Sequence, residues 1–187
     1  MEELFETARL SVYEIDEATS REVTETTGEG DAMLTFLKTN EEAMVLAMQE
    51  DPDAALAYMR KLVQMLQSSD VKRFGGRTKD GKLVVYVAER LISTGKPELQ
   101  VSVTKDSQNK GYATEMLKGL LEWQRSREHI DYYIYKVRLD NAASERVVQK
   151  LGGVPQPAEN RFEELVSRTY YIYMGHNQRE SCHFGKE

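Results

Sequence analysis

The chain has 187 residues, of which 40% are hydrophobic and 30% charged, so it fits one globular domain and excludes collagen-like, low-complexity and wholly disordered proteins. No stretch approaches the roughly 18 apolar residues of a membrane span, and the first residues are acidic, unlike those of a secretory signal. The single cysteine, Cys182, forms no internal disulfide. We therefore expect a protein of the reducing cytoplasm, without a membrane partner.

The charge is unevenly distributed along the chain. The net charge is −6, with 25 basic and 31 acidic side chains, which disfavours a nucleic-acid partner. Residues 14–70 hold 13 acidic and 4 basic residues, whereas the rest of the chain is mildly basic. An acidic segment of this kind either keeps the surface soluble or attracts a cationic ligand, and the sequence leaves both explanations open.

The first third of the chain is predicted to be mostly helical. A short strand is expected over 8–15, followed by mixed sequence with two weak helical candidates at 18–26 and 32–38. The segment from Asn40 to Met48 has the pattern of a capped helix. Asp51 and Pro52 form a helix start, and apolar residues at helical spacing predict a helix from Pro52 to about Gln67.

The remaining sequence alternates between strand and helix signals. We expect strands over 71–78, 83–92, 98–103, 131–139 and 168–174, and helices over 111–127 and 141–151. The turn at 79–82 makes the first two strands a hairpin. A strand, a helix and a strand in sequence require a parallel pair. The predicted fold is therefore α+β, with a mixed, mostly antiparallel sheet of about six to seven strands flanked by helices.

A candidate anion site lies between the strand that ends at Val103 and the next helix. Gly111 and Ala113 leave room for a ligand near the backbone, and the first-turn N–H groups of the helix point toward that space. Lys105 and Lys110 add positive charge. The loop lacks both the Walker and the dinucleotide glycine patterns. The alternative is an ordinary turn between a strand and a helix.

Two motifs in this half of the chain carry a family resemblance. Gln108-Asn-Lys-Gly111-Tyr-Ala113 matches Gln-x-x-Gly-x-Ala after a Val-x-Val strand, and residues 141–152 match Asn-x-x-Ser-x-x-hydrophobic-x-x-Lys-x-Gly. Together, over 71–174, they resemble the GNAT superfamily of N-acyltransferases. The branch with the greatest similarity is that of the ribosomal-protein alanine N-acetyltransferases and their relatives.

The resemblance implies acetyl-CoA as co-substrate and a GNAT-like fold in which strands 98–103 and 132–139 splay to admit the pantetheine arm. Val101 and Val103 would offer main-chain groups to that arm and to the thioester carbonyl. Asn141 would act as a helix cap, as a pantetheine contact, or as both. The loop that would hold the pyrophosphate comprises Gln108, Asn109, Lys110, Gly111, Tyr112, Ala113 and Thr114.

Two residues are candidates for catalysis. Glu98 matches an acidic family position and would take the proton of the attacking amine, although it also reads as an exposed turn glutamate. Ser144 would donate a hydrogen bond to the leaving sulfur, or simply pack beside the cofactor. The sequence departs from the family where Val148 replaces a common tyrosine that protonates the thiolate, and where Gly153 replaces a common aromatic residue.

The expected function is transfer of an acetyl group from acetyl-CoA to a primary amine, of a small molecule or of a peptide N-terminus, by direct attack in a ternary complex. Cys182 lies in the polar tail, which argues against a covalent intermediate. The alternative is a non-catalytic acyl-CoA-binding or interaction module. No metal is expected, because the tail residues His176, Cys182 and His183 lack a fourth ligand.

The domain boundaries follow from the same interpretation. Residues 1–174 are expected to form a single N-acetyltransferase domain, divided into a helical substrate-side segment over 14–70 and an acetyl-CoA-binding core over 71–174. A polar tail is expected over 175–187. Edge strands of this fold often pair between subunits, so family analogy suggests a homodimer.

Overall fold

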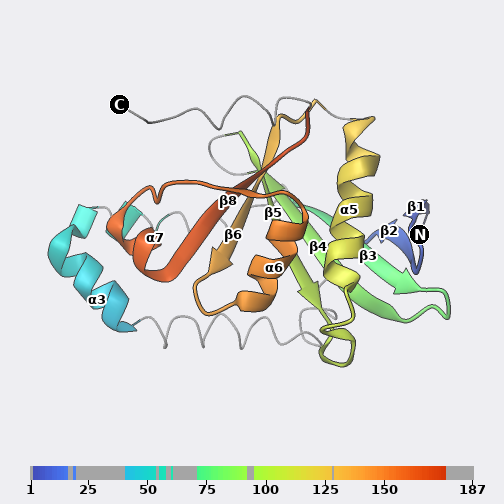
Figure 1. Cartoon of the computed structure of the whole chain (residues 1–187), viewed down its shortest axis with the longest axis horizontal. Helices are drawn as coiled ribbons and strands as arrows, with labels where there is room; N and C mark the ends of the chain where they lie inside the picture. The colour runs from blue at the N-terminus through green and yellow to red at the C-terminus, as the bar shows by residue number, and fades with distance from the viewer. Residues whose placement is uncertain are drawn as a thin grey trace.

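The structure is a computed structural model, and it describes residues 2–16, 19, 41–53, 55–57, 60, 71–91, 95–127 and 129–175. Eight strands of this part form one sheet in the order β1-β2-β3-β4-β5-β6-β8-β7 (Figure 1). The strands are β1 Glu3–Glu6, β2 Leu10–Glu14, β3 Val71–Thr78, β4 Leu83–Leu91, β5 Pro97–Val103, β6 Tyr132–Arg138, β7 Val154–Pro155 and β8 Ser167–Tyr173.

The sheet is mixed, as the sequence predicts. Neighbouring strands are antiparallel except β5 and β6, which are parallel and are joined by a crossover helix. The described residues give eight strands rather than six to seven, because β1 and the two-residue β7 add to the expected set. Both are too short to show an alternating pattern, so only their pairing with β2 and β8 identifies them.

The helices are α3 Glu41–Glu50, α5 Tyr112–Arg125, α6 Ala142–Lys150 and α7 Arg161–Val166, with a 3-10 turn at Lys105–Ser107. The predicted helices at 40–48, 111–127 and 141–151 are confirmed with boundaries shifted by a few residues. The sequence analysis missed α7. It has only six residues, and its start depends on the Asn160 side chain, which accepts a hydrogen bond from Glu163 N at 2.9 Å.

One face of the sheet is covered by α5 and α6. The buried residues of α5 recur at helical spacing along one side, namely Met116, Leu117, Leu120, Leu121 and Gln124. The four apolar residues share a core with Val85, Val87 and Leu99 of the sheet and with Val148 of α6, whereas Gln124 donates a hydrogen bond to Glu89. Burial of each large side chain of this kind stabilises the fold by about 1.5–3 kcal/mol, so α5 fixes the position of the strands beneath it.

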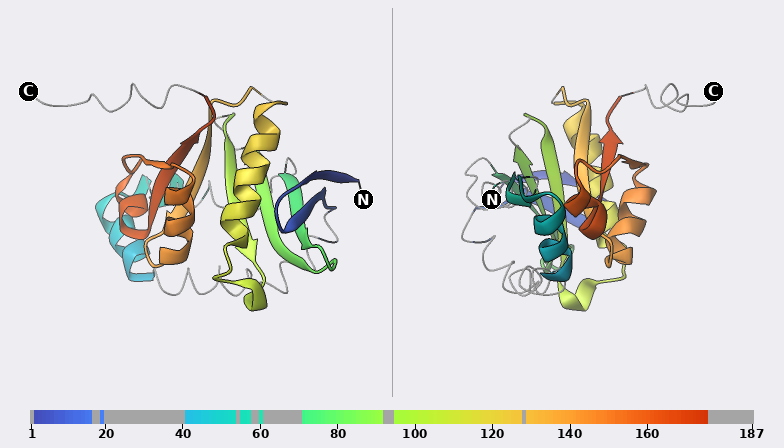
Figure 2. Two further views of the ribbon diagram at one scale, coloured as in Figure 1. Left: turned by 45° about the vertical axis from the view of Figure 1, so that its right-hand side comes forward. Right: turned by 90° about the vertical axis from the view of Figure 1, so that its left-hand side faces the viewer.

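The opposite face of β6 and β8 is covered by α7, and α3 contacts α7. The right-hand view of Figure 2 shows α3 and α6 on opposite sides of these strands. Glu163 of α7 is 1% exposed, and it accepts hydrogen bonds from Lys136 at 2.9 Å and from Thr169 at 2.6 Å. Burial raises the pKa of Glu163. The opposing effect is larger: these two hydrogen bonds, a third from Glu159 N and the charge of Lys136 together bring the pKa below its ordinary value.

Several expectations lie outside the described residues. These are the helical candidates at 18–26 and 32–38, most of the helix from Pro52 to Gln67, and residues 176–187 of the tail, with His176, Cys182 and His183. The division of the chain into a substrate-side segment and a core therefore stays a prediction. No helix among the described residues is long and apolar enough to cross a membrane.

Candidate active site

The sheet opens between β5 and β6. Their parallel pairing is limited to Glu98 with Ile134 and Leu99 with Tyr135, although both strands continue for several residues. Figure 1 shows the two strands close together near their starts and apart at their ends. The splay that the family resemblance implied is therefore present. We call this opening the slot, and the Glu98–Leu99 pairing with β6 its closed end.

The main chain of β5 faces the slot at Val101 and Val103. Thr104 N donates to Val84 O at 3.0 Å. In an antiparallel pair, therefore, Thr104 and every second residue before it along β5 form their main-chain hydrogen bonds with β4. The residues between them turn their N–H and C=O groups toward the slot. Val103 O accepts a hydrogen bond from the Gln108 side chain at 3.4 Å. The side chains of Val101 and Val103 pack against the core, which holds this strand edge rigid.

The loop that follows β5 forms the mouth of the slot. Asn109 and Gly111 have positive φ values of 60° and 84°, and the helix α5 begins directly after them. The first main-chain bond of the helix runs from Glu115 N to Gly111 O at 3.1 Å. The N–H groups of the preceding turn, from Tyr112 to Thr114, therefore have no acceptor within the helix. Such groups bind anions well, particularly with cationic side chains nearby.

The conformation of this loop is held from the other end of the sheet. The turn between β1 and β2 supplies Arg9, which donates from Nε to Glu115 Oε2 at 2.7 Å and from Nη1 to Lys110 O at 3.0 Å. The guanidinium also lies over the Tyr112 ring, 4.4 Å from its centroid. Thr7 Oγ1 donates to Glu115 Oε1 at 2.7 Å. We call this set of contacts the clasp.

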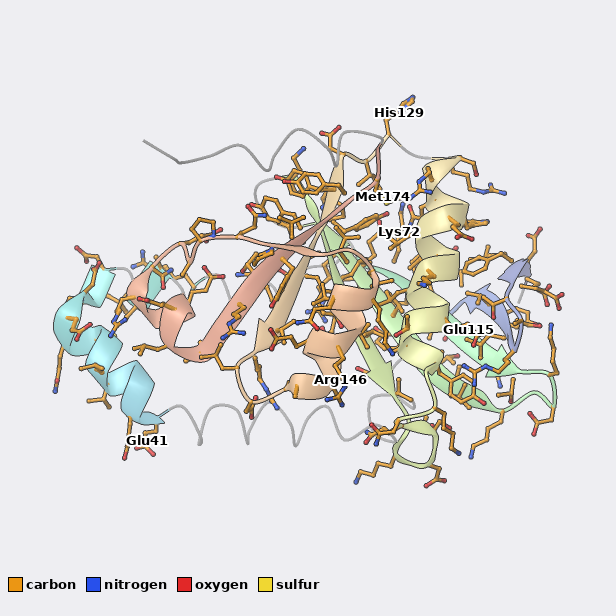
Figure 3. The ribbon with its side chains drawn as sticks, viewed as in Figure 1. Glu41, Lys72, Glu115, His129, Arg146 and Met174 are labelled. Atoms are coloured by element: carbon orange, nitrogen blue, oxygen red, sulfur yellow. The ribbon has the colours of Figure 1, made fainter. Side chains whose placement is uncertain are left out.

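Figure 3 shows Glu115 at the start of α5, at the opposite end of the helix from His129. Burial raises the pKa of Glu115, but the bonds from Thr7 and from Arg9, together with the Arg9 charge, lower it more. The carboxylate therefore stays ionised and keeps its partners. The sequence analysis missed the clasp, because Arg9 and Glu115 are 106 residues apart and a glutamate in a first helical turn is common.

Glu98 lies at the closed end of the slot. It is 7% exposed, so the alternative of an exposed turn glutamate is wrong; the strand begins one residue earlier, at Pro97. Leu99 faces α5, and because side chains alternate along a strand, Glu98 points to the opposite face of the sheet. Arg90 of β4 lies directly opposite Glu98 in the register of the two strands.

Ser144 lies on the α6 side of the same place. Its main-chain N–H donates to Asn141 Oδ1 at 3.0 Å, which confirms Asn141 as the cap of α6. Its hydroxyl is 3.0 Å from the hydroxyl of Tyr135, the residue paired with Leu99 at the closed end. Burial raises the pKa of Tyr135, and the hydrogen bond with Ser144 offsets only part of the rise. Glu98 and Ser144 thus flank the closed end from opposite faces of the sheet.

Comparison with known proteins decides the family. The model of the "Acetyltransferase (GNAT) domain" family matches residues 21–154, which is more than half of the chain. The chain belongs to the GNAT acetyltransferase family. It is therefore an acetyl-CoA-dependent acyltransferase that acts in N-acetylation, with acetyl-CoA as its co-substrate. This finding favours the enzyme over the non-catalytic module, and the placement in the ribosomal-protein alanine branch stays a prediction. A search of curated proteins found no match.

Solved structures share the GNAT fold. Mutant forms of the spermidine/spermine N-acetyltransferase SpeG from Vibrio cholerae are 12% identical with a TM-score of 0.59, over 89% of this chain and 95% of that chain. The dodecameric spermidine N-acetyltransferase from Vibrio cholerae is 11% identical with a TM-score of 0.59, over 93% and 99%. The complex of that enzyme with CoA and spermine is 13% identical with a TM-score of 0.57, over 90% and 97%.

The two departures from the GNAT motif have a structural basis. Val148 is fully buried in the core beneath α6, so this position supplies packing and no polar group. A Cβ at Gly153 would lie 2.5 Å from Val148 Cγ2 and 3.0 Å from Val148 O, so the aromatic residue of other members would not fit there. The loop from Gln108 to Ala113 itself keeps the GNAT pattern Gln-x-x-Gly-x-Ala. Among the described residues, no group of His, Cys, Asp and Glu side chains is arranged to hold a metal ion.

Proposed function

We propose that the enzyme acetylates a primary amine by direct attack on acetyl-CoA within a ternary complex, with Glu98 as the general base. The observation that carries this proposal is the position of Glu98, buried at the closed end of the slot on the face opposite α6. An amine approaching from that face would meet a carboxylate, while the cofactor would occupy the slot from the other side.

The cofactor would be held mainly by main-chain groups. Val101 and Val103 would bind the pantetheine amides and the thioester carbonyl, because their N–H and C=O groups turn toward the slot. A fixed N–H at such an edge stabilises the developing oxyanion, and its loss typically costs about 3 kcal/mol in enzymes. Asn141 would add a pantetheine contact. The pyrophosphate would be bound by Gln108, Asn109, Lys110, Gly111, Tyr112, Ala113 and Thr114.

The acceptor would be a cationic amine. Residues 14–70 carry 13 acidic and 4 basic side chains, which raises the local concentration of cations. The related enzyme from Vibrio cholerae has been solved with CoA and spermine, so polyamines are the first compounds to try. Peptides with a free N-terminal alanine test the other branch. If the acceptor is cationic, its KM should rise with ionic strength, and a KM independent of salt would contradict this part of the proposal.

The experiment has two stages. Calorimetric titration with acetyl-CoA should show micromolar binding, with ADP as a pyrophosphate control. A panel of amines is then assayed for release of CoA thiol in wild type and in Glu98→Gln. Loss of the base should lower kcat by about 100-fold or more while acetyl-CoA affinity is kept.

Glu89→Gln is the matched control. Glu89 is also a buried acid, 6% exposed, on the neighbouring strand β4, but it faces α5 and accepts a hydrogen bond from Gln124. Its replacement should leave kcat unchanged. Equal losses in the two variants, or full activity of Glu98→Gln, would remove Glu98 from its role as base.

We also propose that the enzyme is cytoplasmic and that it self-associates. An enzyme of similar fold is dodecameric, so copies of this chain are expected to associate, and light scattering would distinguish a homodimer from a larger oligomer.

A further inference from the structure

A pair of hydroxyl groups, those of Tyr135 and Ser144, lies at the closed end of the slot, and α6 carries Val148 where many family members have a tyrosine. When the amine attacks the thioester carbon, the C–S bond breaks and its electron pair stays on sulfur, where a hydrogen-bond donor stabilises it. Val148 has no such donor, and it is fully buried. One turn earlier on α6, Ser144 is half-buried and shares a hydrogen bond with Tyr135.

The position of Tyr135 is set by the sheet. Tyr135 pairs with Leu99 on β5 and with Tyr170 on β8, so its backbone is fixed on both sides. It is 2% exposed, and its phenol points to the face that carries α6. Ser144 is fixed too, because its N–H is bound by the cap residue Asn141 at 3.0 Å. The 3.0 Å contact between the two hydroxyls therefore joins two rigid elements at the last paired position before the strands diverge.

The hydrogen bond has a preferred direction. A phenol is a much stronger acid than an aliphatic alcohol, so Tyr135 is the better donor and the Ser144 oxygen the better acceptor. Within the described part of the chain, Tyr135 is the only hydrogen-bond partner of the Ser144 hydroxyl. With its oxygen accepting from Tyr135, Ser144 turns its own hydrogen away from the phenol.

We propose that Tyr135 is a positioning residue that aims the Ser144 hydroxyl at the leaving sulfur of coenzyme A. The inference rests on the proposed function for the location of the thioester. Ser144 donates a hydrogen bond to the thiolate as the C–S bond breaks, and Tyr135 strengthens that donor through the shared chain of hydrogen bonds. No proton leaves Tyr135 or Ser144. The thiolate later takes its proton from water, and the burial that raises the pKa of Tyr135 keeps the phenol neutral.

The first readout is steady-state acetyl transfer by Tyr135→Phe, Ser144→Ala, Ser144→Thr and the double variant. Because a hydrogen bond to a charged group is lost or weakened, Tyr135→Phe and Ser144→Ala should each lower kcat by about 10-fold at an unchanged KM for acetyl-CoA. The double variant should be no slower than Ser144→Ala, since the two residues act as a unit. Ser144→Thr keeps the hydroxyl and should retain most of the activity.

The second readout requires no acceptor amine. The thiol of bound coenzyme A is titrated by the ultraviolet absorbance of its thiolate, because a donor at sulfur lowers the thiol pKa. In Tyr135→Phe and in Ser144→Ala this pKa should rise by about one unit relative to wild type. A change that merely loosens the fold would not shift it in this direction.

Tyr170→Phe is the matched control. Tyr170 lies directly across from Tyr135 on β8, and its hydroxyl also donates to α6, to Glu145 Oε1 at 2.8 Å. Loss of that bond should leave both kcat and the bound thiol pKa at wild-type values. A Tyr135→Phe variant with wild-type kcat and thiol pKa would overturn the inference, as would the same shifts in Tyr170→Phe. Failure of Glu98→Gln to lose activity would contradict the proposed base without affecting the thiol titration.

Discussion

Replacement of Gly111 tests whether the loop conformation makes the acetyl-CoA site. Gly111 has φ 84° as the cap residue of α5, and alanine in this left-handed region costs about 1–2 kcal/mol. Alanine also restricts the unfolded chain, which offsets about 0.4–1 kcal/mol. A Cβ would lie 3.5 Å from Arg9 Nη2, an ordinary contact, so no clash adds to this cost. The net loss of at most about 1.6 kcal/mol should lower Tm by no more than about 6 °C.

Binding should suffer more than stability. Gly111→Ala favours a different loop conformation and so redirects the free N–H groups of the first turn of α5. Losing one hydrogen bond to a charged phosphate is worth about 1.5–3 kcal/mol, which corresponds to about 10- to 100-fold weaker acetyl-CoA binding. Gly81→Ala is the control. Gly81 has φ 89° in the β3–β4 turn, with nothing within 4 Å of an added Cβ.

The two variants are compared by urea denaturation and by calorimetric titration with acetyl-CoA. Both should lose similar stability, because the backbone cost is the same, but only Gly111→Ala should lose affinity. Equal affinity in the two variants would refute the assignment of the loop as the cofactor site. A much smaller stability loss in Gly81→Ala would refute the backbone argument itself.

Two further predictions concern contacts that hold the site and the sheet. Arg9→Ala should raise the KM for acetyl-CoA by about 2- to 5-fold, because it removes a half-exposed ion pair worth about 0.5–1 kcal/mol. As a control, replacement of the exposed Lys79 in the neighbouring turn by alanine should leave this KM unchanged. Equal KM values in the two variants would refute the role of the clasp in holding the loop. Since the pKa of Glu163 is lowered in the folded state, its stabilising effect is complete above its ordinary value of 4.5 and is lost as the pH falls through the folded value. Acid unfolding of Glu163→Gln, followed by circular dichroism, should therefore depend less on pH below about 5, and parallel curves for the two proteins would contradict the role of its bond with Lys136.

Much of the architecture follows from local patterns. Helical spacing identified the helix α5, and the asparagine at 141 identified the start of α6. The strands β6 and β8 were expected from their β-forming sequences, and they pair with Tyr132 opposite Tyr173 and Tyr135 opposite Tyr170. These signals are reliable because each depends on neighbours within one or two turns, or on alternation along one strand.

Other features have no local signal. The strands β1 and β7 and the helix α7 are so short that only their neighbours stabilise them. Likewise, an exposed or a buried Glu98 has the same sequence. Its burial depends on the pairing of β5 with β4 and β6, which involves residues far away in the chain.

The sequence by itself determined the order of strands and helices, the mixed sheet and the glycine loop that we propose binds acetyl-CoA, because spacing and turn chemistry are set by adjacent residues. Only the tertiary structure decided that Arg9 holds this loop, that Glu98 and Ser144 face the slot's closed end from opposite sides, and that Tyr135 meets Ser144. Those contacts join residues from different elements. They exist because α5 and α6 pack on one face of a sheet whose two central strands part after two residue pairs.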